Sequence, residues 1–292
     1  MLPRVAGAAG LLLLLLSPAG HAQPAGPVAS LERWRAEHEA ALRSDDGWLT
    51  VVGLAWLKDG ENRAGSAAGM EVQLPSGAPP RLGTFRLAAG VVTFEPAPGV
   101  DAATNGARGT GGVIRPDVDR VVTGTLTLLV IKRGDRVGVR IKDRESAARR
   151  AFGGEVWYPG SSAWRVTARF ERYDPPKAIP ILNVIGQIEP QPSPGALVFT
   201  LAGREYRLDP IAQGRQLFII FKDLTSGDTT YPSGRFLYAS LPLNGQVELD
   251  FNKAENPPCA FTEFATCPLP PKQNQLPVRI EAGAKYVPHK RP

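Results

Sequence analysis

From Trp48 onward, the sequence favours short β-strands over helices. Apolar and polar residues alternate within strand-length runs, and Gly, Pro and Asn residues separate one run from the next. Val137, Val139 and Ile141, for example, alternate with Arg140 and Lys142, so that the two sets point to opposite faces of one strand. The predicted strands are Leu49–Trp56, Glu71–Leu74, Gly83–Leu87, Val91–Glu95, Leu126–Ile131, Val137–Ile141, Trp164–Phe170, Ile181–Ile188, Ala196–Leu201, Glu205–Leu208, Leu217–Lys222, Arg235–Tyr238, Val247–Phe251 and Val278–Glu281.

One amphipathic helix is predicted before these strands. Ser30 is placed to cap a helix that continues to Ser44. Its apolar stripe follows near-helical spacing and consists of Leu31, Trp34, His38 and Leu42. Because His38 falls on this stripe, we expect a packed or half-buried imidazole rather than a ligand-binding one.

Chain length and the position of the helix indicate two β-rich parts. The chain has 292 residues, and a domain takes roughly 150 residues. We predict a leader and helix over residues 23–44, a small β-sandwich over 45–150, and a larger antiparallel sheet or barrel-like domain over 151–292. The predicted fold class is therefore mostly β, with a helix at the N-terminal end.

The first 22 residues have the pattern of a secretory signal peptide. Arg4 precedes the apolar run Leu11–Leu16, and the small residue Ala22 ends the segment. The apolar run is shorter than the ~20 residues that a membrane-spanning helix needs. We expect cleavage after Ala22 and a periplasmic or secreted protein without a membrane anchor.

Composition and motifs exclude several classes of partner. The formal net charge of +6 is spread along the chain, which gives little reason to expect nucleic acid. No Gly-rich phosphate loop, Gly-x-Ser-x-Gly elbow or His-Glu-x-x-His pair occurs. We therefore expect no cofactor and no metal, and a small polar or anionic ligand is the partner that the sequence leaves open.

Cys259 and Cys267 are the only cysteines. In an oxidising compartment, such a pair most simply forms a disulfide, which would contribute perhaps ~2–3 kcal/mol. A redox-active pair is the sharper alternative, although the spacing is not Cys-x-x-Cys. A zinc site would need distant ligands, because neither His38 nor His289 lies near the thiols in sequence.

The most densely specified segment is Tyr231–Cys267. Its candidates for a ligand site are Tyr231, Arg235, Asp250, Asn252 and Asn256. Alternation places Asp250 and Asn252 on one strand face, and an Asn244-Gly245 turn would fold the Arg235 strand back beside them. Asp250 is then the candidate catalytic base. In the alternative, these groups satisfy backbone donors in Pro-rich turns.

A second polar cluster precedes Arg150. Arg140, Lys142 and Arg149 could form a cationic pocket for a carboxylate or a phosphate. The alternative is the solvated face of a strand that runs into a charged turn, where an ion pair is worth about 0–1 kcal/mol. Both interpretations fit the sequence.

Several of these motifs carry a family resemblance. They are Asp46-Gly47-Trp48-Leu49-Thr50 with Leu57–Asn62, then Ile141-Lys142-Asp143-Arg144, and most strongly Tyr231–Cys267 with Pro268, Asn274 and Leu276-Pro277-Val278. On these residues the mature chain resembles the bacterial and archaeal family called domain of unknown function 1684. The resemblance implies no established activity.

The N-terminal part is also similar to a degenerate forkhead-associated sandwich, on Lys58–Ser66, Val72–Pro75, Gly83–Phe85 and Asn105-Gly106. In that family, phosphothreonine is bound by an Arg after the first glycine and by a Ser-Arg pair before a His. Here Ser66 follows Gly65, and the later stretch reads Pro80-Arg81-Leu82-Gly83. Without the fork of Arg donors, phosphopeptide binding is not expected.

Three functions remain open at this point. The first is an exported binding or accessory module that holds a small polar ligand near Arg235, Asp250, Asn252 and Asn256. The second is a hydrolase-like enzyme acting on an anionic or sugar-like substrate, with Asp250 as the base and the basic groups around Arg140 and Arg149 holding the substrate. The third is a structural envelope protein without a ligand. Whether the two polar clusters face one cavity distinguishes the second from the others.

Overall fold

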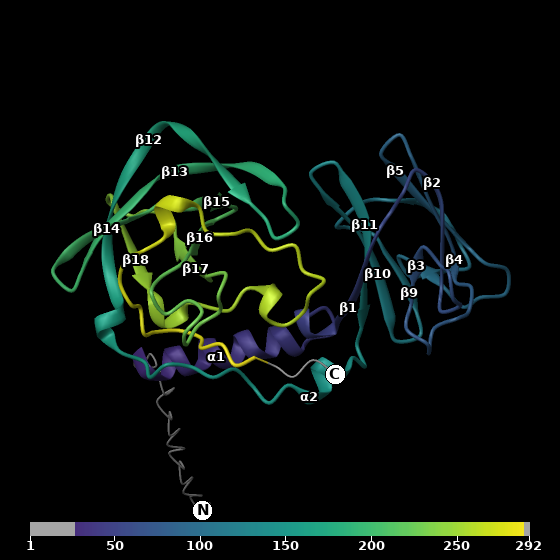
Figure 1. Cartoon of the computed structure of the whole chain (residues 1–292), viewed down its shortest axis with the longest axis horizontal. Coiled ribbons are helices and arrows are strands. Elements are labelled where there is room, and N and C mark those ends of the chain that lie inside the picture. Colours follow the sequence, from purple (N-terminus) through teal and green to yellow (C-terminus); the bar gives the residue numbers. More distant parts are fainter. Residues whose placement is uncertain (1–26, 289–292) are drawn as a thin grey trace, which may run out of the picture.

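A computed structural model of the chain describes residues 27–288 (Figure 1). These residues form one N-terminal helix and several mostly antiparallel sheets, which confirms the mostly β fold class. Among the residues described, no sheet closes into a barrel. The predicted signal peptide, residues 1–22, lies outside the described residues.

Helix α1 (Pro27–Arg43) begins before Ser30, the residue predicted to cap it. Proline is tolerated in the first turn of a helix because the backbone N–H that it lacks has no partner there. Leu31 and Leu42 of the predicted stripe are each 6% exposed. The helix runs beneath the C-terminal sheets and ends beside the N-terminal sandwich (Figure 1), so it connects the two β-rich parts.

A sandwich of two sheets follows the helix and the short 3-10 helix η1 (Trp48–Thr50). The larger sheet contains, in spatial order, β1 (Val51–Trp56), β11 (Arg136–Asp143), β10 (Leu126–Arg133), β9 (Arg120–Thr123), β6 (Ala103–Thr104) and β7 (Ala107–Arg108). The other contains β3 (Val72–Gln73), β2 (Gly60–Gly65), β4 (Gly83–Ala88), β5 (Val91–Pro96) and β8 (Gly112–Ile114).

Strand β11 has two differently covered faces. Val139 and Ile141 belong to the sandwich core, together with Phe85 and Phe94, whose ring centroids are 4.7 Å apart. Because side chains alternate along a strand, Arg140 points away from that core. Arg140 is nevertheless buried, so a second layer of the protein covers this face.

The C-terminal part contains two further sheets. One orders β14 (Arg204–Leu208), β13 (Ile188–Leu201), β12 (Arg165–Leu182) and β18 (Gln246–Asp250), and the other orders β15 (Ile211–Gln213), β16 (Gln216–Phe221) and β17 (Arg235–Ser240). Leu197, Leu237 and Leu249 join them in one apolar core. Short helical turns complete the fold: α2 (Ala147–Ala151), η2 (Ser162–Trp164), η3 (Phe251–Lys253), η4 (Pro258–Ala260) and η5 (Lys272–Asn274).

The observed strands differ from the prediction in several places, and β2, β6, β7, β8, β9 and β15 were not predicted. Strand β12 continues past Pro175 and Pro176, because the register with β13 skips from Arg172 to Lys177 and the prolines need not donate to the ladder. The predicted strand Ile181–Ile188 contains the turn that joins β12 to β13, and no strand forms over Val278–Glu281.

The Asn244-Gly245 turn forms, with positive φ angles of 52° and 73°. The strands that it joins belong to different sheets, however, since β17 pairs with β16 and β18 pairs with β12. The predicted ladder between these two strands is therefore wrong.

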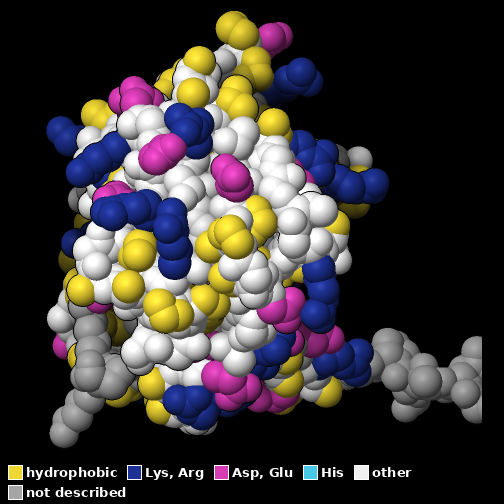
Figure 2. Space-filling view, turned by 90° about the vertical axis from the view of Figure 1, so that its right-hand side faces the viewer, with side chains coloured by type: hydrophobic (Ala, Val, Ile, Leu, Met, Phe, Trp, Pro, Cys, Tyr) yellow, Lys and Arg dark blue, Asp and Glu magenta, His cyan; other side chains and the backbone are white. Residues whose placement is uncertain are grey.

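The outer end of the sandwich carries both signs of charge, interspersed with small apolar patches (Figure 2). Partly exposed ion pairs on the sandwich include Arg63 with Glu71 at 2.9 Å and Arg115 with Asp119 at 2.7 Å. Neither sign of charge dominates the face shown. Over residues 27–288, no helix is long and apolar enough to cross a membrane.

Asn274 fastens the C-terminal segment to the sheets. Its side chain is 1% exposed. The amide Nδ2 donates to the carbonyls of Asp209 and Ile220 at 3.0 and 2.9 Å, and Oδ1 accepts from the N–H of Asp209 at 2.8 Å. One side chain thereby satisfies backbone groups of two neighbouring segments.

We expect Asn274→Ala to lower the free energy of unfolding by about 2–4 kcal/mol, because buried backbone groups lose their partners. Urea unfolding followed by circular dichroism measures the loss. The adjacent, exposed Gln273 bonds only the Asp209 carboxylate, at 3.3 Å, so Gln273→Ala is the control and should stay within about 0.5 kcal/mol of wild type. Equal losses in both variants would contradict this account.

Candidate functional site

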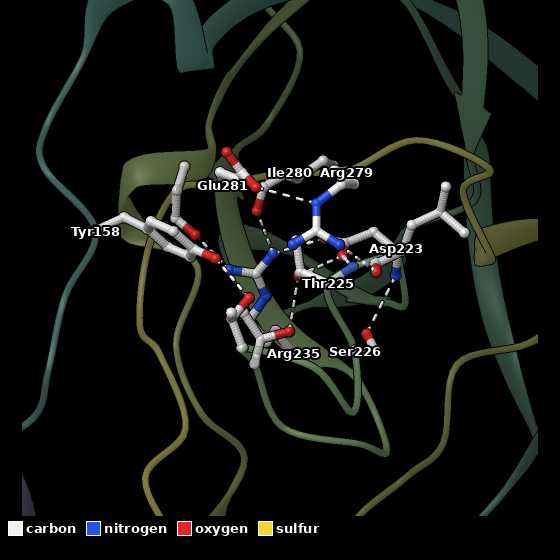
Figure 3. Close-up of polar contacts among 12 residues, drawn as sticks. Tyr158, Asp223, Thr225, Ser226, Arg235, Arg279, Ile280 and Glu281 are labelled. Atoms are coloured by element: carbon white, nitrogen blue, oxygen red, sulfur yellow. Dashed lines mark hydrogen bonds and ion pairs between the residues drawn. The ribbon is translucent and has the colours of Figure 1, made fainter.

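Arg235 of β17 is buried in an ion pair rather than presented to a ligand (Figure 3). Its side chain is 1% exposed, and Nη2 lies 2.6 Å from Asp223 Oδ2. Nη2 also donates to the carbonyl of Ile280 at 2.9 Å, and Nη1 donates to that of Ala282. Burial lowers the pKa of Arg235, while the Asp223 charge opposes this change.

Both oxygens of the Asp223 carboxylate accept hydrogen bonds. Its Oδ1 accepts from the N–H of Thr225 at 2.6 Å and from the Thr225 hydroxyl at 2.5 Å. The loop around Asp223 and the segment through Ile280 and Ala282 are therefore fixed to β17 by one guanidinium. This arrangement gives Arg235 a structural role.

Asp250 and Asn252 stabilise a turn at the end of β18. Asp250 Oδ1 accepts from the N–H and the Nδ2 of Asn252 at 3.2 and 2.8 Å, and Oδ2 accepts from Arg165 at 3.0 Å. Asn252 also exchanges two hydrogen bonds with the backbone of Ser161, each 2.9 Å long. The bonds to Asp250 cap the 3-10 helix that follows β18, and the bonds to Ser161 fix the loop before β12 to it.

Tyr231 and Asn256 lie closer to the cysteines. The Tyr231 hydroxyl donates to the carbonyl of Cys259 at 3.1 Å. Asn256 Nδ2 donates to Glu155 Oε1 at 3.0 Å and to the carbonyl of Lys285 at 2.9 Å. Asn256 also lines a hollow between the two parts of the protein, which none of the other C-terminal candidates does.

Lys142 and Arg149 bind the turn that follows α1. Lys142 Nζ donates to the carbonyl of Asp46 at 2.8 Å and lies 3.1 Å from its carboxylate. Arg149 Nε donates to the carbonyl of Arg43 at 2.7 Å, and Nη2 lies 2.8 Å from Asp45 Oδ1. Both cations thus already have local partners.

The two predicted clusters do not face one cavity. Asn252, which holds Asp250, bonds Ser161, and the neighbouring Gly160 packs against Leu31 near the start of α1. Arg149 instead bonds Arg43 at the end of α1. At 1.5 Å per residue, the helix separates these two attachment points by roughly 18 Å.

Arg140 is the exception among the predicted cations. Its side chain is on β11, the residue is 4% exposed, and the guanidinium carbon lies 4.9 Å from the centroid of the Trp48 ring. Within the described structure, its buried Nε and Nη2 have no hydrogen-bond partner. Burial, together with the neighbouring charge of Arg133, lowers the pKa of Arg140 to about 10, although Asp117 and the two cysteines act in the opposite direction. The alternative of a solvated strand face is therefore wrong for this residue.

Two adjoining hollows form what we call the junction groove, and Arg140 lines neither of them. Their volumes are about 280 and 400 Å³. The residues that line both are Arg133, Gln213, Phe218, Thr266 and Pro268. Since Arg133 comes from the sandwich and the other four from the C-terminal part, the groove lies where the two parts of the protein meet.

The larger hollow has aromatic walls. They are formed by Trp48, Phe218, Phe236, Tyr238 and Phe261. The Phe218 ring is stacked on Tyr238 with centroids 5.0 Å apart and meets Phe236 edge-on at 4.9 Å. Flat, apolar surfaces of this kind suit a planar ligand.

His38 closes one end of the larger hollow. Its Nε2 lies 2.8 Å from Glu155 Oε2, and Nδ1 lies 3.3 Å from Glu255 Oε2. Burial opposes protonation of the ring, but the two carboxylates outweigh it and raise the pKa of His38 to about 10. His38 is thus a half-buried imidazolium that links α1 to two other segments. Its place on the helix stripe predicted a packed or half-buried ring.

The structure does not show the predicted disulfide. Cys259 and Cys267 are free thiols. The backbone N–H of Cys259 donates to Cys267 Sγ at 3.1 Å, so the second sulfur is held against the first residue as a hydrogen-bond acceptor. Contact with Cys259, assisted by burial, raises the pKa of Cys267. Over residues 27–288, no group of three or more His, Cys, Asp or Glu side chains could hold a metal ion.

Sequence reasoning missed most of the groove. Trp48 entered only as part of a family motif, and Arg133, Gln213 and Phe218 were not singled out. Phe218 lies in a correctly predicted strand, but nothing in its local pattern distinguishes the wall of a hollow from the core. Only the pairing of distant segments brings these residues together.

We expect Arg235→Met to lower the free energy of unfolding by about 3–5 kcal/mol, because the Asp223 charge would remain buried without a partner. Urea denaturation gives the value. Arg279→Met is the control, since Arg279 is 43% exposed and pairs with the exposed Asp228; it should cost less than about 1 kcal/mol. A small loss at Arg235 would refute the structural role.

His38 also makes stability depend on pH. Because its folded pKa of about 10 exceeds the unfolded value of 6.5, its contribution is complete below pH 6.5 and declines as pH rises towards 10. The free-energy difference between wild type and His38→Gln should be on the order of 1–4 kcal/mol at pH 6 and smaller at pH 9.5. Urea unfolding at both pH values measures it. A difference that grows with pH would contradict this sign.

The chain is similar to a family of unknown function and to a solved structure of an uncharacterized protein. No curated protein matches the chain. The uncharacterized protein from gene locus rrnAC0354 of Haloarcula marismortui, solved by NMR in solution, is 28% identical, over 47% of this chain and 78% of that chain, with a TM-score of 0.40. The forkhead-associated resemblance of the N-terminal part stays a prediction. Residues 150–285 match the family described as "Protein of unknown function (DUF1684)", which confirms the family resemblance predicted from the sequence motifs.

Proposed function

We propose that this protein is an exported module of the cell envelope that binds a small ligand in the junction groove. The observation that carries the proposal is the larger hollow, of about 400 Å³, in which five aromatic side chains meet the polar side chains of Gln213, Glu255 and Thr266 between the two parts of the protein. Ligand sites are typically concave, mostly apolar and equipped with a few polar groups, and they occur preferentially between domains. The junction groove has each of these properties.

The exported location of this module rests on the sequence of residues 1–22. In an oxidising compartment, we further propose that Cys259 and Cys267 become joined, because the sulfur of one already lies against the backbone of the other. Cys267 lines the larger hollow. A disulfide there would hold the η4 turn (Pro258–Ala260) in place and preserve this wall.

The hydrolase alternative has weaker support. Asp250 is engaged by Arg165 and Asn252, and Arg149 is at the other end of α1. A base and an anion-binding cation that are far apart cannot act on one small substrate. The groove therefore favours a binding function.

The test is a thermal-shift screen with a small-molecule collection, using wild type and Gln213→Trp. Gln213 is exposed and lines both hollows, so an indole there should block the groove without disturbing the core. Ligands that raise the melting temperature of wild type by a few degrees should have no effect on this variant.

Gln275→Trp is the matched control. It places the same side chain at another exposed position, beside a separate hollow of about 620 Å³ that lies outside the junction groove. This variant should keep the wild-type response. A collection that stabilises neither protein, or stabilises Gln213→Trp equally, would refute binding in the groove.

A further inference from the structure

We propose that the hollow of about 620 Å³ beside Gln275 is a docking surface for an extended, acidic segment of a partner protein. We call this hollow the proline cleft, because Pro180, Pro232, Pro270 and Pro271 are among the residues that line it. It shares no lining residue with the junction groove, so the inference does not rest on the proposed function.

One wall of the proline cleft belongs to an exposed apolar ribbon. The end of β12 and the start of β13 form this ribbon, which lies above the other C-terminal strands in Figure 1. Because side chains alternate between the two faces of a strand, Ile179 and Ile181 are buried, whereas the opposite face carries exposed apolar residues. These form the cross-strand pairs Ala178 with Pro192, Pro180 with Pro190, and Leu182 with Ile188. An exposed apolar surface of this kind commonly marks an interaction site.

Backbone hydrogen bonds fix the proline cleft at both ends. The N–H of Leu269 donates to the carbonyl of Leu182 at 2.7 Å, and the N–H of Lys222 donates to the carbonyl of Asn274 at 3.0 Å. The two prolines that follow Leu269 have fixed φ angles, so this wall has little freedom to lose when a partner binds. A preformed surface of this kind lowers the entropic cost of association.

The other end of the proline cleft is cationic. Lys222 and Lys272 line it, whereas none of its described lining residues is acidic. Lys272 comes three residues after Leu269 in the chain. The bond to Asn274 places the backbone of Lys222 beside the same turn, η5. In the part of the chain that the structure describes, neither ammonium has an ion-pair partner.

Two carboxylates near this end already have cationic partners. Asp223, which is next to one of the lysines in sequence, lies 2.6 Å from Arg235 in the buried ion pair. Asp209, which accepts a hydrogen bond from Gln273, lies 3.7 Å from Arg207 Nε. The positive charge of the two lysines is therefore available to an acidic side chain of a partner, and complementary charges of this kind guide association and register.

The two ends of the proline cleft set the spacing of the groups that it can bind. Leu269 and Lys272 are three residues apart, a span of at most ~10 Å. In a polyproline II segment, residues three positions apart lie on one face and are separated by about 9 Å. A partner segment with an apolar side chain three positions from an Asp or Glu therefore fits both ends. Residues 1–26 and 289–292 contain no Asp or Glu, so they offer no such acidic side chain.

The test is isothermal titration calorimetry with decapeptides that contain Leu-Pro-Pro-Glu or, for the opposite chain direction, Glu-Pro-Pro-Leu. At least one of them should bind wild type. Replacing its Glu by Gln should weaken binding by about threefold or more, because the contact with the lysines is lost. Replacing its Leu by Ser should cost about tenfold, because the apolar contact is lost. If neither peptide binds, or if the Glu and Gln peptides bind equally, the inference is overturned.

Lys222→Met and Lys272→Met should each weaken binding of the Glu peptide and leave binding of the Gln peptide unchanged. Neither ammonium has an ion-pair partner within residues 27–288, so both variants should keep the melting temperature of wild type. Lys132→Met is the matched control, because Lys132 is exposed and does not line the proline cleft. Its affinity should stay within about twofold of wild type. Equal losses in all three variants would reduce the effect to general electrostatics and overturn the inference.

The two tryptophan variants separate this inference from the proposed function. Gln275 is exposed and lines the proline cleft, so Gln275→Trp should abolish peptide binding, while Gln213→Trp should leave it unchanged. The opposite pattern would place the peptide in the junction groove and overturn the inference. If the small-molecule screen finds no ligand of the junction groove but the peptide binds as described, the proposed function fails and this inference stands.

Two other occupants of the proline cleft are outcomes of the same experiments. Cosedimentation of wild type with phosphatidylglycerol vesicles, without binding of either peptide, would assign the apolar ribbon to a membrane surface. A dimer in sedimentation velocity that Gln275→Trp dissociates would assign the cleft to a second copy of the chain. Either result would overturn the inference.

Discussion

The buried ion pair between Arg235 and Asp223 organises the C-terminal part of the protein. One guanidinium binds a loop carboxylate and two carbonyls of the segment that contains Ile280 and Ala282, and its carbon lies 5.2 Å from the centroid of the Phe221 ring. That segment in turn packs into the core of both C-terminal sheets. The groove needs this order, because its walls come from β15, β16, β17 and the loops that follow them.

Helix α1 and the sandwich supply the other side of the groove. The end of the helix packs Leu42 against Leu49 and Phe152, with Trp48 and Phe261 beside them. The half-buried imidazolium of His38 bridges Glu155 and Glu255, which lie far apart in the sequence. Apolar contacts and one charged cluster thus hold the parts together while leaving a hollow between them. Buried polar atoms without a hydrogen-bond partner in this junction include Nε and Nη2 of Arg140 and Oδ1 of Asn256.

The sequence predicted features that depend on local pattern. Alternation identified β11, and the Asn244-Gly245 turn was placed correctly. Two-residue strands such as β6 (Ala103–Thr104) carry no such pattern. The candidate site was predicted only in part, because the role of a polar side chain depends on the groups that contact it in the folded protein. Arg235 is structural since Asp223 meets it, and Arg140 is buried since Trp48 and the C-terminal part cover it; neither partner lies near its arginine in the sequence.

The lining of the junction groove crosses the boundary of the family segment, residues 150–285. Trp48, one of the aromatic walls, and Arg133 of β10, which lines both hollows, lie outside the segment. Proteins that share the segment can therefore share most of the aromatic walls and differ at these two positions. On our proposal, specificity within the family would vary through the neighbouring domain, and grouping its members by the segment alone would mix proteins with different ligands.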